Sequence, residues 1–195
     1  MQKLFLFVAL TLALPLIAQA QEAPRVQVFG GYSYMRLEDS GMDGQDRDLN
    51  GYNLSGAITV FKKSLAIKAD ISGHFGDQFV NVTPRIDLGQ TLFLFGPQYT
   101  FRKNEMFQPF AHALFGVARL KLENDAVNPS ITDTGFAFAF GGGVDVKALS
   151  SKIAVRLVQA DFVRTKLDIL NSGNSSSSNN IRVSTGIVLR FGKIE

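Results

Sequence analysis

The chain has no cysteine and no tryptophan, and its 195 residues include only two histidines. Without cysteine the fold cannot be stabilised by disulfide bonds, so an exported product needs another source of stability. The net charge is only +3 at pH 7 and the basic residues are scattered, a pattern that does not indicate a nucleic-acid partner. Beyond the first 20 residues, no apolar run approaches the roughly 20 residues of a membrane-spanning helix.

The N-terminal segment has the pattern of a secretory signal peptide. Lys3 precedes an apolar run from Leu4 to about Ile17, and small residues follow at Ala18 and Ala20. This order predicts cleavage after Ala20 and a mature domain of residues 21–195. An uncleaved anchor is the alternative, but the run is too short to favour a spanning helix.

Eight segments of the remaining chain alternate apolar and polar residues, most clearly in 52–60 and 65–72. Successive side chains of a strand point to opposite faces, so each segment predicts a strand with one apolar face. The predicted strands are Val26–Leu37, Gly51–Phe61, Leu65–Phe75, Thr91–Phe101, Phe107–Leu120, Gly135–Val146, Ile153–Val163 and Ile181–Phe191. Most have about the 9–11 residues that a tilted strand needs to cross a bilayer.

The connections between these segments alternate in length. The long, polar ones are Glu38–Asn50, Gly76–Gln90, Lys121–Thr134 and Arg164–Asn180, and the short ones are Lys62–Ser64, Arg102–Met106 and Lys147–Lys152. Bacterial outer-membrane barrels have short periplasmic turns and long external loops. The sequence therefore predicts an all-β fold, an eight-stranded antiparallel up-and-down transmembrane β-barrel in the outer membrane, with both termini periplasmic.

The two faces of the predicted strands differ in chemistry, and aromatic residues gather at two heights. The apolar face includes Leu54, Ile67, Phe93 and Ile187, whereas polar or small residues such as Ser33 occupy the opposite face. The aromatic residues at the ends facing the long connections are Tyr34, Tyr52, Phe75, Phe136 and Phe162, and those at the other ends are Tyr99, Phe101, Phe107 and Phe191. Two aromatic girdles are typical of the two membrane interfaces, which places the apolar face in lipid.

Four segments resemble the bacterial outer-membrane β-barrel domain family, which is related to the transmembrane domain of outer membrane protein A. They are VFGGYSY at 28–34, LFGPQ at 94–98, GGGVDV at 141–146 and STGIVLRF at 184–191. The resemblance covers essentially the whole mature chain and implies architecture rather than activity. The chain departs from that pattern in three ways: it has no Trp for the girdles, residues 192–195 follow the terminal aromatic Phe191, and we expect no peptidoglycan-binding domain after the barrel.

Charged residues fall on the inward face of several strands. They are Lys68, Asp70, Asp145, Arg156, Asp161, Arg182 and Arg190. An eight-stranded barrel is just wide enough for side chains to fill it, so we expect a structural ion-pair network, with a channel lining as the alternative. Strict alternation from Arg156 would turn Asp161 into lipid, which predicts a β-bulge near Leu157-Val158.

Catalytic or metal-binding patterns are weak in this sequence. His74 and His112 both phase inward, and neither has an acid and a nucleophile at a spacing typical of the barrel enzymes that modify lipid A. The acid-rich segment 38–48 could attract a divalent cation, but its spacing does not match an EF-hand, and we expect a solvated loop. Residues 171–180 are nearly all Ser and Asn and are expected to be mobile. No cofactor is predicted.

The sequence thus favours a non-catalytic, monomeric outer-membrane barrel with a structural or surface-interaction role. Its expected partners are outer-membrane lipids and, during insertion, the outer-membrane assembly machinery, with no surface partner identifiable. The alternatives are a small-solute channel, a lipid A-modifying enzyme and a soluble periplasmic barrel that carries a ligand. The last would need an apolar interior, which the inward charges argue against.

Overall fold

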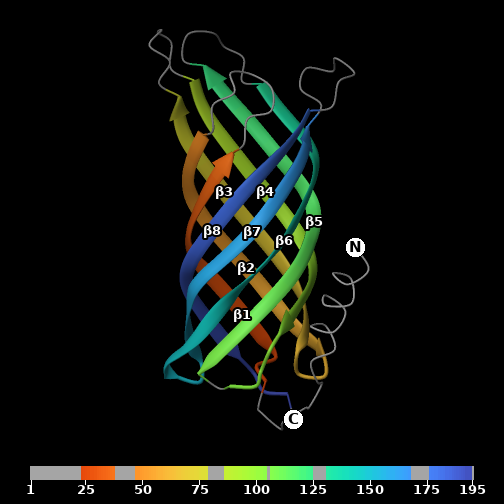
Figure 1. The fold of residues 1–195 in the computed structure, drawn as a ribbon, viewed down its shortest axis with the longest axis vertical. Helices are drawn as coiled ribbons and strands as arrows, with labels where there is room; N and C mark the ends of the chain where they lie inside the picture. The colour runs from red at the N-terminus through yellow and green to blue at the C-terminus, as the bar shows by residue number, and fades with distance from the viewer. Residues whose placement is uncertain are drawn as a thin grey trace, which may run out of the picture.

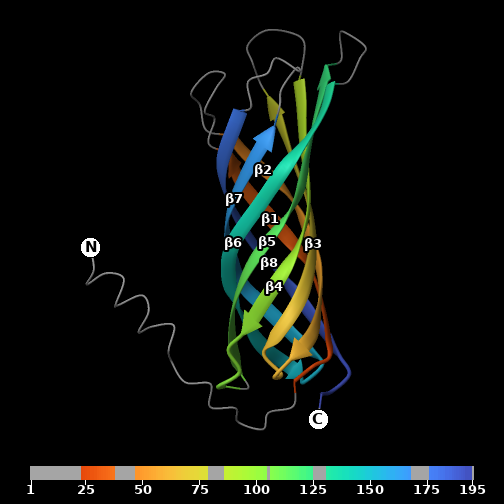
Figure 2. The same cartoon turned by 90° about the vertical axis from the view of Figure 1, so that its right-hand side faces the viewer.

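Eight antiparallel strands form one closed barrel in the computed structural model, which describes residues 23–37, 47–78, 86–104, 106–124, 131–167 and 176–194. The strands are β1 (Val26–Leu37), β2 (Arg47–Phe61), β3 (Leu65–Gln78), β4 (Ile86–Thr100), β5 (Phe107–Asn124), β6 (Ile131–Ser150), β7 (Ile153–Leu167) and β8 (Ser176–Phe191). Each strand pairs with its neighbours along the chain, and β8 pairs with β1. Figures 1 and 2 show a tall barrel with steeply inclined strands. Among the described residues, no helix is long and apolar enough to cross a membrane. The predicted signal peptide lies outside these residues.

Most strands are longer than the sequence predicted. At the end with the long connections the ladders continue through polar residues, for example to the pairs Asp77–Asp87 and Leu167–Ser176. Backbone hydrogen bonds hold a ladder together whatever the side chains, so strands can extend beyond their apolar part. The connections at this end shrink to 38–46, 79–85, 125–130 and 168–175, which lie outside the described residues. The length alternation is therefore weaker than predicted, because 101–106 at the other end is as long as 125–130.

The segment 171–180 was also predicted incorrectly in part. Residues 176–180 belong to β8 rather than to a mobile loop, and Asn180 pairs with Leu37 of β1. Residues 171–175 and the acid-rich segment 38–46 lie outside the described part of the chain.

The predicted faces are confirmed. Large apolar side chains point outward and are exposed, including Leu54 (52%), Ile67 (56%), Phe95 (53%) and Ile187 (56%). Polar and charged side chains point inward and are buried, including Lys68, Asp70 and Arg182. The girdle rings contact one another, with Tyr52 and Phe75 at one height and Tyr99 and Phe101 at the other. An apolar exterior around a polar interior is the reverse of a soluble protein and fits a wall that faces lipid.

The predicted bulge in β7 is confirmed. Arg156 pairs with Gly186 and Gln159 pairs with Ser184, so Leu157 and Val158 together oppose a single residue of β8. Both of these side chains point outward, with exposed fractions of 55% and 44%. The extra residue reverses the phase of the strand and turns Gln159 and Asp161 into the lumen, as a β-bulge does.

Part of the interior is apolar, which the sequence analysis did not predict. Met35, Leu49, Leu92, Leu94 and Leu114 point inward and are at most 3% exposed. They form one cluster with Ala118, Ala137, Ala139 and Val163. Met35 and Leu49 lie near the ends of β1 and β2 that face the segment 38–46, so apolar side chains fill the lumen toward that end.

The seam between β1 and β8 closes the barrel and depends on two glycines. Gly31 pairs directly with Gly186, and a Cβ added at Gly31 would lie 2.0 Å from the carbonyl oxygen of Thr185. The strands approach too closely there for any side chain. Next to the seam, a bridge joins Ala23 to Ile194, so the two terminal segments lie at the same end of the barrel.

Candidate functional site: the charged core of the lumen

The centre of the lumen holds Arg182 between two carboxylates. Its Nε and Nη2 donate to Oδ2 of Asp161 at 2.9 and 2.6 Å, and its Nη1 donates to Oδ1 of Asp70 at 2.8 Å. All three side chains are at most 2% exposed. Asp161 comes from β7 and Arg182 from the neighbouring β8, whereas Asp70 comes from β3, so the ion pair of Arg182 with Asp70 joins strands that are not neighbours in the barrel. A buried guanidinium is tolerated only when its charge is paired, and here two carboxylates pair it.

A second connection crosses the full width of the lumen. Lys68 of β3 forms an ion pair with Asp70 at 3.2 Å, and its Nζ donates to Oε1 of Gln159 of β7 at 3.4 Å. β3 and β7 are opposite strands in the closed order of eight. Side chains from opposite walls therefore meet in the middle, as expected for a barrel of this size.

Arg156 forms a third part of the network. Its Nε and Nη2 donate to the two carboxylate oxygens of Asp145 at 2.8 and 3.2 Å, and its Nη1 donates to Gln159 at 2.6 Å. Its guanidinium carbon lies 4.3 Å from the ring centre of Phe29 and 4.2 Å from that of Phe110. The charge is thus held by a bidentate carboxylate in its plane and by aromatic faces, which is a strong arrangement for arginine.

Six of the seven predicted lumen residues belong to this network, and Gln159 joins its two halves. Gln159 accepts from Arg156 and Lys68 and donates to Oδ2 of Asp161 at 2.7 Å. The seventh residue, Arg190, is only 6% exposed and forms no ion pair with the other six. Its Nε and Nη2 have no hydrogen-bond partner.

Arg102 lies at the same end of the barrel as Arg190, whose charge acts on it. It lies in the connection between β4 and β5, and it donates to the carbonyl of Lys63 at 2.6 Å and to Oε1 of Gln108 at 3.1 Å. Burial and the neighbouring charge of Arg190 lower the pKa of Arg102 to about 10. The group stays protonated at neutral pH and adds positive charge to this mouth of the lumen.

Both histidines point inward, as predicted, and both have lumen partners. Nε2 of His112 lies 2.8 Å from Oδ1 of Asp161, and Nε2 of His74 lies 2.9 Å from the hydroxyl of Ser33. Ser33 in turn contacts Ser184 at 2.9 Å. His112 with Asp161 is a histidine–carboxylate pair, but it is buried, and neither residue forms a hydrogen bond with a serine of the described part of the chain.

Several members of the network were missed by the sequence analysis. Asn53 and Ser72 bind Asp70 and Arg182, respectively, at 2.8 Å, and Gln159 and His112 bind Asp161. The alternation predicted that these four side chains point inward. It did not predict their hydrogen-bond partners, because an uncharged side chain can pair with an acid or a base. Among the residues that the structure describes, no group of three His, Cys, Asp or Glu side chains could hold a metal ion.

Residues 6–191 match the family model described as the outer membrane protein beta-barrel domain. The chain belongs to this family. The match covers almost the whole chain, so the closed barrel with its apolar exterior is the family's architecture, and the protein is an outer-membrane β-barrel. No curated protein matches the chain.

Three solved structures of small outer-membrane proteins resemble this family member. Ail, the attachment invasion locus protein of Yersinia pestis, is 16% identical, and the match covers 86% of this chain and 99% of Ail with a TM-score of 0.58. Neisserial surface protein A is 12% identical, and the match covers 88% of this chain and 100% of that protein with a TM-score of 0.62. OprG from Pseudomonas aeruginosa is 14% identical, and the match covers 88% of this chain and 97% of OprG with a TM-score of 0.53. At these identities the likeness concerns the fold alone.

Proposed function

We propose that the protein is a monomeric, non-catalytic barrel with a closed lumen, which supports the envelope and presents its long connections at the cell surface. The observation that carries this proposal is the cross-lumen network, in which Lys68 meets Gln159 and Arg182 joins Asp70 to Asp161. The inward apolar cluster around Leu92 and Leu114 adds a second obstruction. A lumen filled at two places has no open path for solutes.

The proposed orientation has both termini in the periplasm and the ends with the long connections outside. The bridge between Ala23 and Ile194 supports one part of it, that the two terminal segments lie at the same end of the barrel. The longer connections at the opposite end favour that end as the external one. The expected partners are the lipids that cover the apolar wall and, during insertion, the assembly machinery of the outer membrane. Loops on such a rigid scaffold are where binding specificity usually lies.

A narrow polar channel is the second candidate. It is favoured by buried polar atoms without a hydrogen-bond partner, among them Nδ1 of His74, Nδ1 of His112 and Nε of Arg190. Such atoms usually contact water, so part of the lumen is expected to be hydrated. The apolar cluster opposes a continuous water path through it.

Planar-bilayer conductance separates the two candidates. The closed barrel predicts no steady current, whereas a channel predicts steady openings that increase when the network is broken by Arg182→Gln. Mass spectrometry of lipid A from strains with and without the protein tests catalysis, and identical lipid A is the expected result. Steady, weakly selective currents from the unmodified protein would overturn the closed-lumen proposal.

A further inference from the structure

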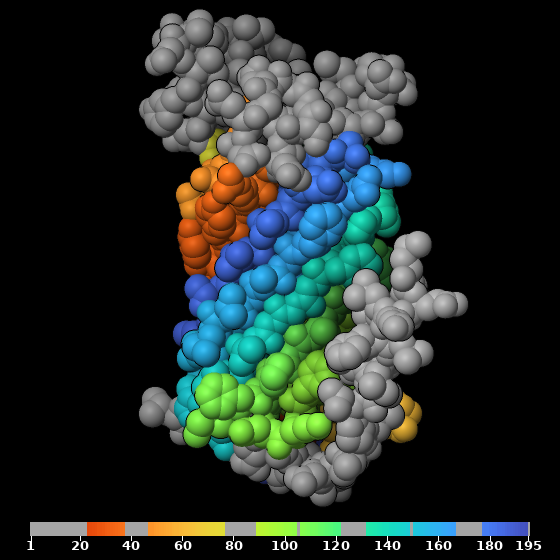
Figure 3. Space-filling model, in the orientation of Figure 1, coloured from red at the N-terminus to blue at the C-terminus, as the bar shows by residue number. Residues whose placement is uncertain are grey.

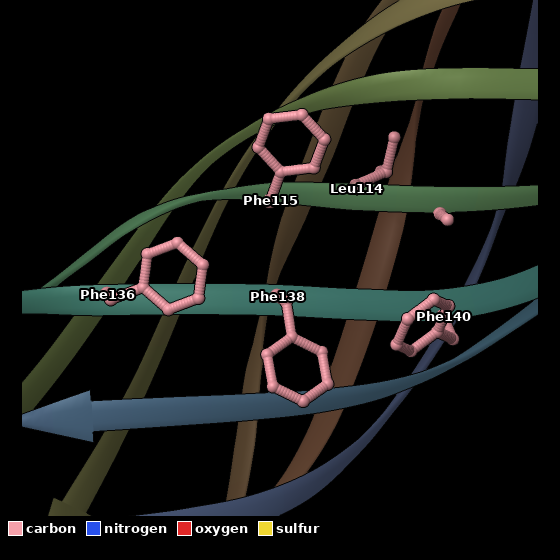
Figure 4. Close-up of a pocket in the computed structure, with 6 residues that line it drawn as sticks. Leu114, Phe115, Phe136, Phe138 and Phe140 are labelled. Atoms are coloured by element: carbon pink, nitrogen blue, oxygen red, sulfur yellow. The ribbon is translucent and has the colours of Figure 1, made fainter.

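The lipid-facing wall of β5 and β6 carries a shallow groove lined by aromatic residues. The residues lining it are Ala113, Leu114, Phe115, Phe136, Phe138 and Phe140. Phe115 pairs with Phe138 across the ladder, and the small Ala113 pairs with Phe140. Figure 4 shows the rings of Phe115 and Phe138 turned away from each other, toward the strands on either side. The Phe115 ring packs edge-on against Phe95 of β4, with 4.6 Å between the ring centres, and the Phe138 ring packs against Phe140, with 5.5 Å between the ring centres.

Basic side chains flank this groove at the end with the long connections. Arg119 lies two residues beyond Val117 on β5, while Arg164 and Lys166 of β7 pair directly with Phe138 and Phe136 of β6. All three continue the outward phase of their strands. The wall that carries them is the set of adjacent diagonal bands of β5, β6 and β7 in Figure 3.

The described charges of this wall are of one sign. Among the outward-facing side chains of β5, β6 and β7 that the structure describes, none is acidic. On β6, which lies between the basic residues, Arg119 pairs with Thr134, whereas Lys166 and Arg164 pair with Phe136 and Phe138. Nε of Arg164 is buried and has no hydrogen-bond partner. On the other side of the barrel, Asp48 accepts a hydrogen bond from Tyr34 on the outer wall, so the basic wall is local.

We propose that this wall binds a phosphorylated, multiply acylated glycolipid of the outer leaflet, namely the lipid A part of lipopolysaccharide. An acyl chain lies in the groove between Phe115 and Phe138, and the phosphates bind Arg119, Arg164 and Lys166. The inference rests on the proposed orientation, which puts these residues at the outer surface. Guanidinium and ammonium groups form strong, charge-assisted hydrogen bonds with phosphate.

The spacing of the basic residues favours a ligand with two phosphates. Arg119 and Lys166 pair with Thr134 and Phe136 of the strand between them, which lie two residues apart. Two strand spacings and two residues of rise separate their backbones by roughly 12 Å. A phospholipid has one phosphate beside its acyl chains, whereas a disaccharide phosphorylated at both ends offers two, spread over several chains.

Binding of purified lipopolysaccharide to the folded protein in detergent tests the proposal, with native mass spectrometry as the readout. The first variant replaces the wall residues together, Arg119→Gln, Arg164→Gln and Lys166→Gln. A matched control removes three exposed basic residues at the other end, Lys62→Gln, Lys103→Gln and Lys152→Gln. Ala113→Phe fills the groove without changing charge. Resistance of the folded barrel to SDS on unheated gels shows that each variant is folded.

The wall variant should bind lipopolysaccharide at least about tenfold more weakly, since each basic residue near an anionic lipid surface contributes measurably. Ala113→Phe should also weaken binding, and the control should match the unmodified protein. Equal binding by the wall variant, or equally tight binding of phosphatidylglycerol, would overturn the proposal. Because this assay is independent of orientation and conductance, its failure leaves the closed-lumen proposal untouched.

Discussion

Asp161→Ala is the substitution that tests the lumen most directly. The carboxylate of Asp161 accepts hydrogen bonds from Arg182 through two nitrogens, from Gln159 at 2.7 Å and from His112 at 2.8 Å. Alanine removes all of these acceptors at once. Arg182 then keeps only Asp70 and the hydroxyl of Ser72 as partners, and part of its charge is uncompensated in a site with 0% exposure.

The expected loss in the free energy of unfolding is about 3–5 kcal/mol, the usual cost of removing one partner of a buried ion pair. Asp161→Asn keeps the size of the side chain and some hydrogen bonds, so its loss should be smaller. Asp48→Ala is the control, because Asp48 is exposed on the outer wall, where it accepts a hydrogen bond from Tyr34. Its unfolding midpoint should remain close to that of the unmodified protein.

Urea unfolding from detergent micelles, followed by circular dichroism and tyrosine fluorescence, measures these differences. Combining Asp161→Ala with Arg182→Met should recover part of the loss, since both charges of the pair are then absent. Unfolding of Asp161→Ala at the same urea concentration as the unmodified protein would refute the reasoning. It would mean that water already solvates Arg182 in the folded barrel.

Three further outcomes are expected. Arg156→Lys should lower the free energy of unfolding by about 1–2 kcal/mol in the same assay. Lysine keeps the charge but loses the bidentate contact with Asp145 and the position of the guanidinium over the rings of Phe29 and Phe110. A stability equal to that of the unmodified protein would contradict this. Protease added to intact cells should cut within 38–46 or 168–175, the parts of the predicted loops that lie outside the strands, and should spare Arg102–Met106. The reverse pattern would invert the proposed orientation. Intact-mass measurement of the protein from outer membranes should give a chain that begins at Gln21, whereas a chain that retains residues 1–20 would rule out cleavage.

The strand faces could be predicted from the sequence because lipid and lumen impose opposite chemistry on alternate residues. Even the bulge at Leu157-Val158 was predictable, since a carboxylate at Asp161 is costly in lipid and only an extra residue turns it inward. The strand ends were not predictable. Toward the end with the long connections the ladder continues through polar pairs such as Lys166–Ser177 and Thr165–Ser178, which show no apolar alternation.

The apolar cluster and the exact partners in the lumen escaped the sequence analysis for different reasons. On β4, Phe93 marked the outward phase, and alternation then turns Leu92 and Leu94 inward, but these two residues were not recognised as part of an apolar cluster. The contact of Lys68 with Gln159 joins opposite strands, and it depends on strand tilt and stagger, which alternation does not encode. For the same reason the sequence did not show that Nε and Nη2 of Arg190 lack hydrogen-bond partners.

The seam between β1 and β8 has a consequence for the order in which the barrel assembles. Seven of the eight ladders join strands that follow one another in the chain and can form as successive hairpins. At the eighth, Ser33 meets Ser184 across 151 positions, so this contact carries the largest loop-closure entropy and must form late. Until Gly31 and Gly186 meet, β1 and β8 are two open edges that can pair with another chain. Pairing of Gly31 with Gly186 therefore closes the barrel and removes the two edges through which chains could aggregate.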